Sequence, residues 1–160
     1  MGYGRLFRLV CVGGTFETIH AGHRRLLDEA FKSSDYILIG LTSDELALEL
    51  GKPYKVSPYI EREERLRAYL DSRYKGRYSI VKLNDVYGVA IDVAELEAIF
   101  VTEETRVRAE EINRIRASRG LNPLEIVVVP FVLAEDGRPI SSTRIKGGEI
   151  DSEGRLKPCR

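Results

Sequence analysis

The chain has 160 residues, 31% of them charged and 43% hydrophobic, which suits a single domain with a core of its own. Lys plus Arg and Asp plus Glu each number 25, so the chain lacks the basic excess typical of nucleic-acid-binding proteins. It has no run of about 20 apolar residues to span a membrane, and residues 1–8 lack the apolar core of a signal peptide. Cys11 and Cys159 form no Cys-x-x-Cys pair, so we expect no protein-held metal site and a cytoplasmic location.

Apolar, β-branched runs alternate with helical patterns along the chain, and no internal repeat is present. We expect strands at 6–12, 36–41, 78–83, 99–101 and 126–129. We expect helices at 22–31, 60–73 and 105–119, another capped by Thr42 with Glu45 as capping-box partner, and a short helix at 141–146. This alternation predicts one doubly wound, Rossmann-like α/β domain over 1–160, with a mainly parallel five-stranded sheet and a polar tail from about 151.

Ligands of such sheets bind beyond the carboxyl ends of the strands, where the strand order reverses. The segments that follow the predicted strands are therefore the candidate binding loops. They are 13–23, 42–55, 84–88, 102–106 and 130–144.

The loop from Gly13 to His23 follows the first predicted strand and opens the first predicted helix. Gly13 and Gly14 would let the backbone approach a ligand, and the helix start would offer free N–H groups to a phosphate. His20 and His23 are three residues apart, so in a helical turn they share one face, and Gly22 leaves room for a phosphate. Neither a Walker loop nor Gly-x-Gly-x-x-Gly is present, so no dinucleotide redox site is indicated.

His20-Ala21-Gly22-His23 is similar to the His-x-Gly-His signature of the nucleotidyltransferase superfamily, and 13–23 as a whole resembles its opening segment. Both histidines of the chain fall here, which favours a functional site over an incidental strand-to-helix turn. Family members usually carry Asp where this chain has Glu17, so we assign Glu17 no catalytic role. The resemblance implies catalytic roles for His20, His23 and Thr15, and ligand contacts from Gly13, Gly14, Phe16 and Gly22.

Two later segments complete the predicted phosphate site. Ile140-Ser141-Ser142-Thr143-Arg144 resembles the superfamily's late Ile-Ser-Ser-x-x-Arg-like segment, although hydroxyls at a helix start are more often caps. The resemblance implies that Ser141, Ser142, Thr143 and Arg144 hold the ATP phosphates. A lysine before the 60–73 helix reaches the reacting phosphates in this family, and the match favours Lys55, with Lys52 as the alternative.

Three shorter elements resemble those of archaeal and eukaryotic phosphopantetheine adenylyltransferases. They are Asp85-Val86-Tyr87-Gly88, Val101-Thr102-Glu103-Glu104-Thr105 and Ile112-Asn113-Arg114-Ile115-Arg116. The resemblance extends from about Leu9 to Ile150 and also implies that Arg106 lies near ATP. Most other charges of the 105–119 helix are expected to be solvated.

The resemblance implies that the chain transfers the adenylyl group of ATP to 4′-phosphopantetheine, giving 3′-dephospho-coenzyme A and pyrophosphate. Mg²⁺ is expected to arrive with ATP, bound through phosphates and water rather than by protein ligands. The alternatives are another superfamily enzyme, such as an FAD synthetase or a cytidylyltransferase, or a nucleotide-binding homologue without catalysis. No nucleic-acid or membrane partner is expected, and the sequence leaves the oligomeric state open.

Overall fold

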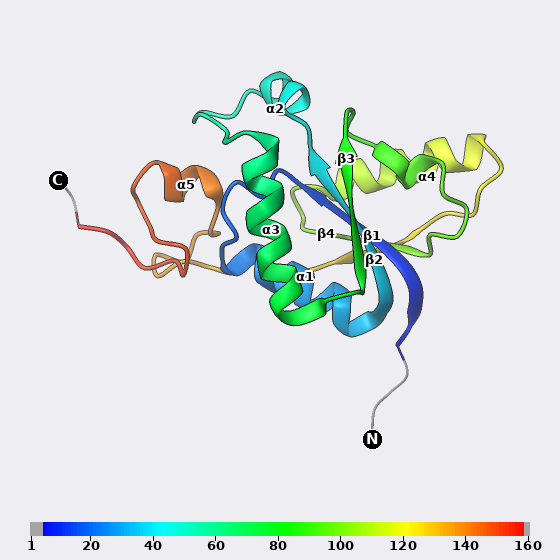
Figure 1. The fold of residues 1–160 in the computed structure, drawn as a ribbon, viewed down its shortest axis with the longest axis horizontal. Helices are drawn as coiled ribbons and strands as arrows, with labels where there is room; N and C mark the ends of the chain where they lie inside the picture. Colours follow the sequence, from blue (N-terminus) through cyan, green and yellow to red (C-terminus); the bar gives the residue numbers. More distant parts are fainter. Residues whose placement is uncertain (1–4, 159–160) are drawn as a thin grey trace.

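A computed structural model describes residues 5–158 and contains one five-stranded, all-parallel sheet with the order β3-β2-β1-β4-β5. The strands are β1 (Phe7–Gly14), β2 (Ser34–Thr42), β3 (Tyr78–Leu83), β4 (Ala98–Val101) and β5 (Glu125–Val128). The helices are α1 (Ala21–Ser33), α2 (Asp44–Leu50), α3 (Tyr59–Tyr74), η1 (Gly88–Ile91), α4 (Arg106–Ser118) and α5 (Ser142–Lys146). The predicted Rossmann-like α/β fold is confirmed (Figure 1).

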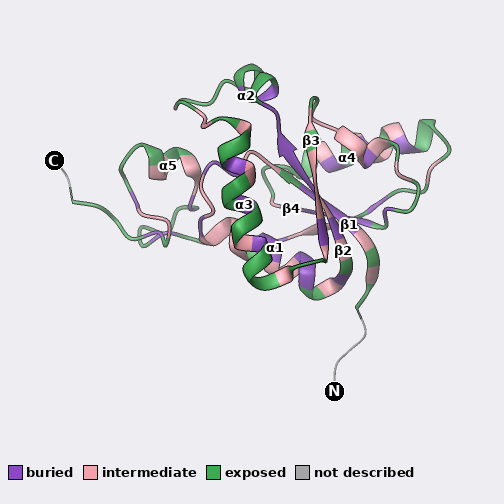
Figure 2. Cartoon of the chain, viewed as in Figure 1, coloured by how far each residue is buried: buried purple, intermediate pink, exposed green. Residues whose placement is uncertain are grey.

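The sheet is covered on both faces, as its strands require. In β1, Val10 and Val12 face a core shared with α1 and α3, whereas Cys11 faces a second core shared with α4 and η1. β4 alternates in the same way, and all four of its residues are buried. Parallel strands buried on both faces read as continuous apolar runs, which is why the sequence reveals them. Figure 2 shows the sheet as the buried layer between helices with exposed outer faces.

The sheet order places a binding crevice at the centre of the molecule. From β1 the chain builds outward through β2 and β3, then returns to the other side of β1 with β4 and β5. The order therefore reverses between β1 and β4, and their carboxyl ends open onto one crevice. The loops after β1 and β4 are the ones that carry the histidine signature and the Val101–Thr105 element.

One local prediction, the cap of α2, needs correction. α2 is capped by Ser43, whose hydroxyl accepts from the backbone N–H of Leu46 at 3.1 Å, so the predicted Thr42–Glu45 capping box is wrong. Thr42 instead donates to the carbonyl of Gly14 and links β2 to β1. The polar tail is hydrogen-bonded back onto the domain as far as residue 157, through an isolated bridge between Ile150 and Leu156. Cys159 lies outside the described residues.

Candidate functional site

A cleft of about 480 Å³ lies at the carboxyl ends of the strands, where the strand order reverses. The histidine loop, the 51–58 loop, the start of α4 and the start of α5 all contribute to its walls. The lining combines polar and apolar side chains, and we call its apolar part, which includes residues of β2, β3, η1 and α4, the apolar chamber. Most of the predicted site residues line this cleft: Gly13, Gly14, Thr15, Phe16, His20, Gly22, His23, Ser141, Ser142 and Thr143.

His20 and His23 form a stacked pair at the start of α1. Their ring centroids are 3.8 Å apart with an interplanar angle of 18°, so the two side chains share one face, as their spacing predicts. Phe16, which has a φ of +50°, packs against the His23 ring at 4.9 Å. A positive φ in a buried phenylalanine is a strained conformation, and such strain concentrates at functional sites.

The backbone amides at the start of α1 are not free, contrary to the sequence-based expectation. Nδ1 of His20 caps the helix by accepting from the N–H groups of Gly22 at 3.0 Å and His23 at 3.3 Å. The N–H of Ala21 donates to the carbonyl of Ser152 at 3.0 Å. A phosphate at this site would therefore meet the imidazole donors and the helix dipole rather than unpaired amides. Gly22 is also needed for the cap, because a Cβ there would lie 2.9 Å from the His20 ring.

Both imidazoles are neutral at physiological pH. Burial, followed by the charges of His23 and Arg24, lowers the pKa of His20 to about 3. Burial also lowers the pKa of His23 to about 4, although the backbone of Thr18 acts in the opposite direction. Thr18 makes no hydrogen bond of normal geometry with His23, whose buried Nδ1 lacks a partner among the described residues. Since Nδ1 of His20 accepts two hydrogen bonds, the proton of that neutral ring lies on Nε2.

We expect an NMR titration to show both rings neutral from pH 8 down to about pH 5, because their folded-state pKa values lie near 3 and 4. An unfolded histidine titrates near pH 6.5, so the unfolded state takes up protons first as the pH falls. The free energy of unfolding should therefore decrease as the pH drops from about 6.5 toward 4. Urea unfolding at pH 7 and pH 5 would measure this, and titration of either ring near 6.5 would contradict the neutral pair.

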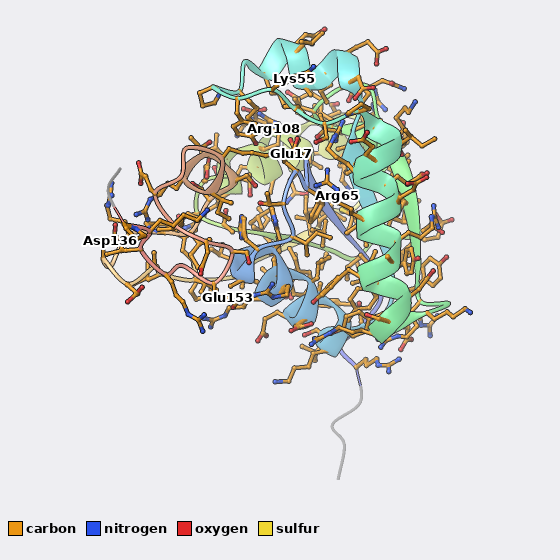
Figure 3. All side chains as sticks on the ribbon, turned by 60° about the vertical axis from the view of Figure 1, so that its left-hand side comes forward. Glu17, Lys55, Arg65, Arg108, Asp136 and Glu153 are labelled. Atoms are coloured by element: carbon orange, nitrogen blue, oxygen red, sulfur yellow. The ribbon has the colours of Figure 1, made fainter. Side chains whose placement is uncertain are left out.

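The loop between α2 and α3 brings Lys52, rather than Lys55, to the cleft. Lys52 and Tyr54 line the cleft wall, and the charge of Lys52 acts on His23. Lys55 is not among the lining residues, and Figure 3 shows it on the stretch of chain beside α2. Of the two candidates, the structure thus places the alternative, Lys52, on the cleft wall and Lys55 outside it. The resemblance placed the phosphate-binding lysine of the family in the loop before α3. Only the path of that loop decides which of its lysine side chains lines the cleft.

Arg144 is committed to structural contacts away from the cleft. Its guanidinium pairs with Asp136 and with Glu149 (2.7 Å) and donates to the carbonyl groups of Arg138 and Pro139. The side chain is only 11% exposed and does not line the cleft. In the structure, Arg144 joins α5 to the 130–140 loop and to Glu149, and its predicted phosphate contact stays a prediction. Ser141 is both a cap and a lining residue, since it accepts from the N–H of Arg144.

Replacing Arg144 by alanine should lower the melting temperature, because Asp136 and Glu149 would each lose a charged partner. The KM for ATP should stay close to the wild-type value, because the guanidinium is held by Asp136, Glu149 and two carbonyl groups and does not line the cleft. Thermal unfolding and initial-rate kinetics on one preparation would separate the two effects. A large rise in the KM for ATP with an unchanged melting temperature would support the predicted contact of Arg144 with the ATP phosphates.

Arg106 also does not line the cleft. It pairs with Glu103 and Glu110 and its side chain is 50% exposed, whereas Arg108 lines the cleft. The two arginines are two residues apart on α4, which places them about 200° apart around the helix axis. Sequence reasoning chose the arginine at the helix start, and the orientation of α4 against the sheet favours Arg108. Sequence reasoning missed Arg108, although the neighbouring Ala109 forms, with Ile112 and Arg116, the helically spaced face of α4 that is buried.

The shorter family elements mainly hold the cleft walls in place. Asp85 accepts from the N–H groups of Tyr87 and Gly88 and shapes the turn before η1. Asn113 exchanges two hydrogen bonds with the backbone of Leu124, the residue just before β5. The buried Arg116 donates to the carbonyl groups of 90, 93 and 122. Sequence reasoning treated these elements only as family markers, and their side chains fix η1 and α4 above the apolar chamber.

The described residues contain no group of three or more His, Cys, Asp or Glu side chains placed to hold a metal ion. Within residues 5–158, no helix is both long enough and apolar enough to cross a membrane. The polar part of the cleft is lined by imidazole, ammonium and hydroxyl donors, which suit an anion. Such a wall fits a metal ion that enters bound to the phosphates of a nucleotide.

The fold and the histidine loop define a nucleotidyltransferase: the cytidylyltransferase-like family model matches residues 11–148. The chain is 45% identical over 152 residues to a phosphopantetheine adenylyltransferase of Methanothermobacter thermautotrophicus, covering 95% of this chain and 91% of that protein. It is 46% identical over 155 residues to the enzyme of that name from Methanopyrus kandleri, covering 96% and 95%. The chain belongs to the phosphopantetheine adenylyltransferase family.

Solved structures agree with this fold. A crystal structure of a protein of unknown function from Archaeoglobus fulgidus superimposes with a TM-score of 0.69 at 35% identity, covering 77% of this chain and 89% of that chain. A putative nicotinate-nucleotide adenylyltransferase from Vibrio parahaemolyticus gives a TM-score of 0.57 at 11% identity, with coverages of 92% and 83%. At 11% identity the second match supports the fold alone.

Proposed function

We propose that this chain transfers the adenylyl group of ATP to 4′-phosphopantetheine, and that the transfer takes place in the cleft between β1 and β4. The observation that carries the proposal is the stacked, neutral His20–His23 pair on the cleft wall of a chain that belongs to this family. The products are 3′-dephospho-coenzyme A and pyrophosphate. An oxygen of the phosphopantetheine phosphate forms a bond to the α-phosphorus of ATP, and the bond to the β,γ-pyrophosphate breaks.

The reaction needs no general base and no covalent enzyme intermediate. The second pKa of a phosphate monoester is about 6, so the attacking group is largely dianionic at neutral pH. The protein then contributes positioning and charge stabilisation in an in-line transfer. Neutral imidazoles can perform this task, because each keeps one N–H group that can donate a hydrogen bond to a phosphate oxygen.

The polar wall divides into groups for the two substrates. His20 and His23 hydrogen-bond the region of the α- and β-phosphates, where charge develops as pyrophosphate leaves. Lys52 bridges the reacting groups, and Thr15 orients the attacking phosphate. The hydroxyls at the start of α5 hold the β- and γ-phosphates, with Mg²⁺ entering as MgATP. They belong to Ser141, Ser142 and Thr143.

The apolar chamber supports an acceptor with an extended, uncharged arm. It is lined under η1 by Leu38, Val81, Leu83, Val86, Val89, Ala90 and Ile112. Pantetheine is a chain of methylene, methyl and amide groups, so most of its surface gains from burial against such a wall. A flavin mononucleotide or a phosphocholine acceptor would offer a bulky ring system or a cationic head to the same chamber.

The test is pyrophosphate release from MgATP with and without 4′-phosphopantetheine. Release that depends on phosphopantetheine is expected. Release with flavin mononucleotide, or with CTP in place of ATP and another phosphorylated acceptor, would keep the superfamily and overturn the substrate assignment. ATP binding by calorimetry without pyrophosphate release from any acceptor would support a non-catalytic binding protein. We place the activity in the cytoplasm, where its phosphorylated substrates are expected.

A further inference from the structure

The loop at 51–58 has no helix or strand of its own, although two of its side chains line the cleft. It leaves α2 at Gly51, which has a φ of +65°, and enters α3 after Pro58. Lys52 and Tyr54 can serve a ligand reproducibly only if contacts from elsewhere fix the loop. Those contacts converge on one residue, Ser57, which does not itself line the cleft.

Glu17 holds Ser57 from one side. This side chain is 1% exposed, and its carboxylate accepts from the N–H of Ser57 at 2.5 Å and from its hydroxyl at 2.6 Å. Arg65 of α3 donates to it at 3.3 Å, and Nζ of Lys146 at the end of α5 lies 3.6 Å away. Burial opposes ionisation, but the hydrogen bonds from Ser57 and the nearby cations lower the pKa of Glu17, so the group is a carboxylate.

Arg62 holds the same residue from the other side. Its guanidinium is fully buried and donates to the carbonyl of Ser57 at 2.8 Å. It also donates to the carbonyl of Thr15 at 3.0 Å and to that of Thr42 at 2.8 Å. Ser57 thus has its N–H, hydroxyl and carbonyl all bound, and the 51–58 loop is tied to the segments that follow β1 and β2.

Glu17 therefore connects three segments that are far apart in sequence. It belongs to the β1–α1 loop with the histidine pair, binds the loop of Lys52 through Ser57, and faces Lys146 of the helix that begins at Ser142. Figure 3 shows Glu17 and Arg65 at the centre of the molecule, below Lys55. Glu17 does not line the cleft, and its oxygens are occupied by these partners, so it has no direct path to a substrate.

We propose that Glu17 is a positioning residue for ATP, acting through Ser57 and Lys146 to set the Lys52 loop and α5 around the triphosphate. The inference rests on the proposed function for the identity of the ligand. Glu17 connects the 51–58 loop and α5 to the histidine loop. Its effect should therefore fall on ATP more than on phosphopantetheine, whose arm the proposed function assigns to the apolar residues that line the cleft around η1.

The test compares Glu17→Gln, Glu17→Asp and Ser57→Ala with a matched control. Glu17→Gln keeps the size of the side chain but removes its charge, and we expect the KM and Kd for ATP to rise by at least ~10-fold, as for small displacements of binding groups. Glu17→Asp keeps the charge and should lie closer to the wild type. Ser57→Ala removes one donor and should show a smaller rise. The control is Asp71→Asn, whose carboxylate accepts from Tyr78 at the opposite end of β3.

The outcomes separate this proposal from the proposed function. A KM for ATP within about twofold of the wild type in Glu17→Gln, or an equal rise in Asp71→Asn, would overturn the positioning role. If Glu17→Gln does not fold, Ser57→Ala decides, and an unchanged ATP affinity there counts against the proposal. Lack of phosphopantetheine-dependent turnover in the wild type would contradict the proposed function alone. Calorimetric ATP binding would still measure the effect of Glu17.

Discussion

The variant His23→Ala is expected to lose roughly 10²–10³ in kcat, the cost of removing one oriented donor at a transition state. The His23 ring stacks on His20 at 3.8 Å, is neutral, and lies on the cleft wall. Its hydrogen bond to phosphate should strengthen as negative charge moves to the leaving pyrophosphate, so kcat should fall more than ATP affinity. Single-turnover rates and calorimetric ATP binding would measure the two separately, and near-normal turnover would contradict the role.

His20 offers a control for the structural part of this effect. Nδ1 of His20 caps α1, and its Nε2–H is the donor left for phosphate. His20→Asn keeps an oxygen that can cap the helix but removes the Nε2 donor, whereas His20→Ala removes both. Both variants should lose turnover to a similar extent, and the alanine variant should lose about a further 1 kcal/mol of stability. Full activity in His20→Asn would show that His20 serves only as a cap.

The variant Lys52→Ala is expected to lower kcat/KM for ATP by roughly 10²–10³, because a positioned ammonium neutralises charge on the transferring group. Lys52 lines the cleft, and its charge acts on His23, so it lies on the side where the triphosphate would bind. The measurement is initial-rate kinetics with ATP varied at saturating phosphopantetheine. Raising the salt concentration should weaken ATP binding less in the variant than in the wild type.

Lys55→Ala is the matched control, because Lys55 is an exposed lysine of the same loop that does not line the cleft. Its kcat/KM should stay within about threefold of the wild type, as for an isolated surface charge. A larger loss of kcat/KM in Lys55→Ala than in Lys52→Ala would mean that the 51–58 loop changes conformation when ATP binds and brings Lys55 into the cleft. It would also restore the order that the sequence first suggested.

The sequence by itself determined the elements and the class of site. The central apolar runs of β1, β2 and β4 are buried on both sides of the sheet, so they are recognisable without any partner. The histidine loop was recognisable because its glycines, its two histidines and the helix start are neighbours in sequence, and a local motif carries its own geometry. The stacking of His20 on His23 follows from that helical spacing.

Only the tertiary structure decided which long side chains line the cleft. The rotation of α4 on the sheet brings Arg108 to the cleft and leaves Arg106 outside it. The path of an irregular loop likewise brings Lys52 to the cleft and leaves Lys55 outside it. Arg144 matches the family signature, but its partners Asp136 and Glu149 hold it outside the cleft. These outcomes depend on contacts between distant segments, which local sequence patterns do not encode.

The same reason explains the two contacts that sequence reasoning could not foresee. The carbonyl of Ser152 accepts a hydrogen bond from the N–H of Ala21, the first residue of α1, although some 130 residues separate the two segments in the sequence. Glu17 was set aside because it departs from the usual Asp, yet its buried carboxylate joins the loop of Lys52 to the histidine loop. The chemistry of this protein could be predicted from local motifs, whereas the arrangement that holds its catalytic groups together is a property of the folded chain.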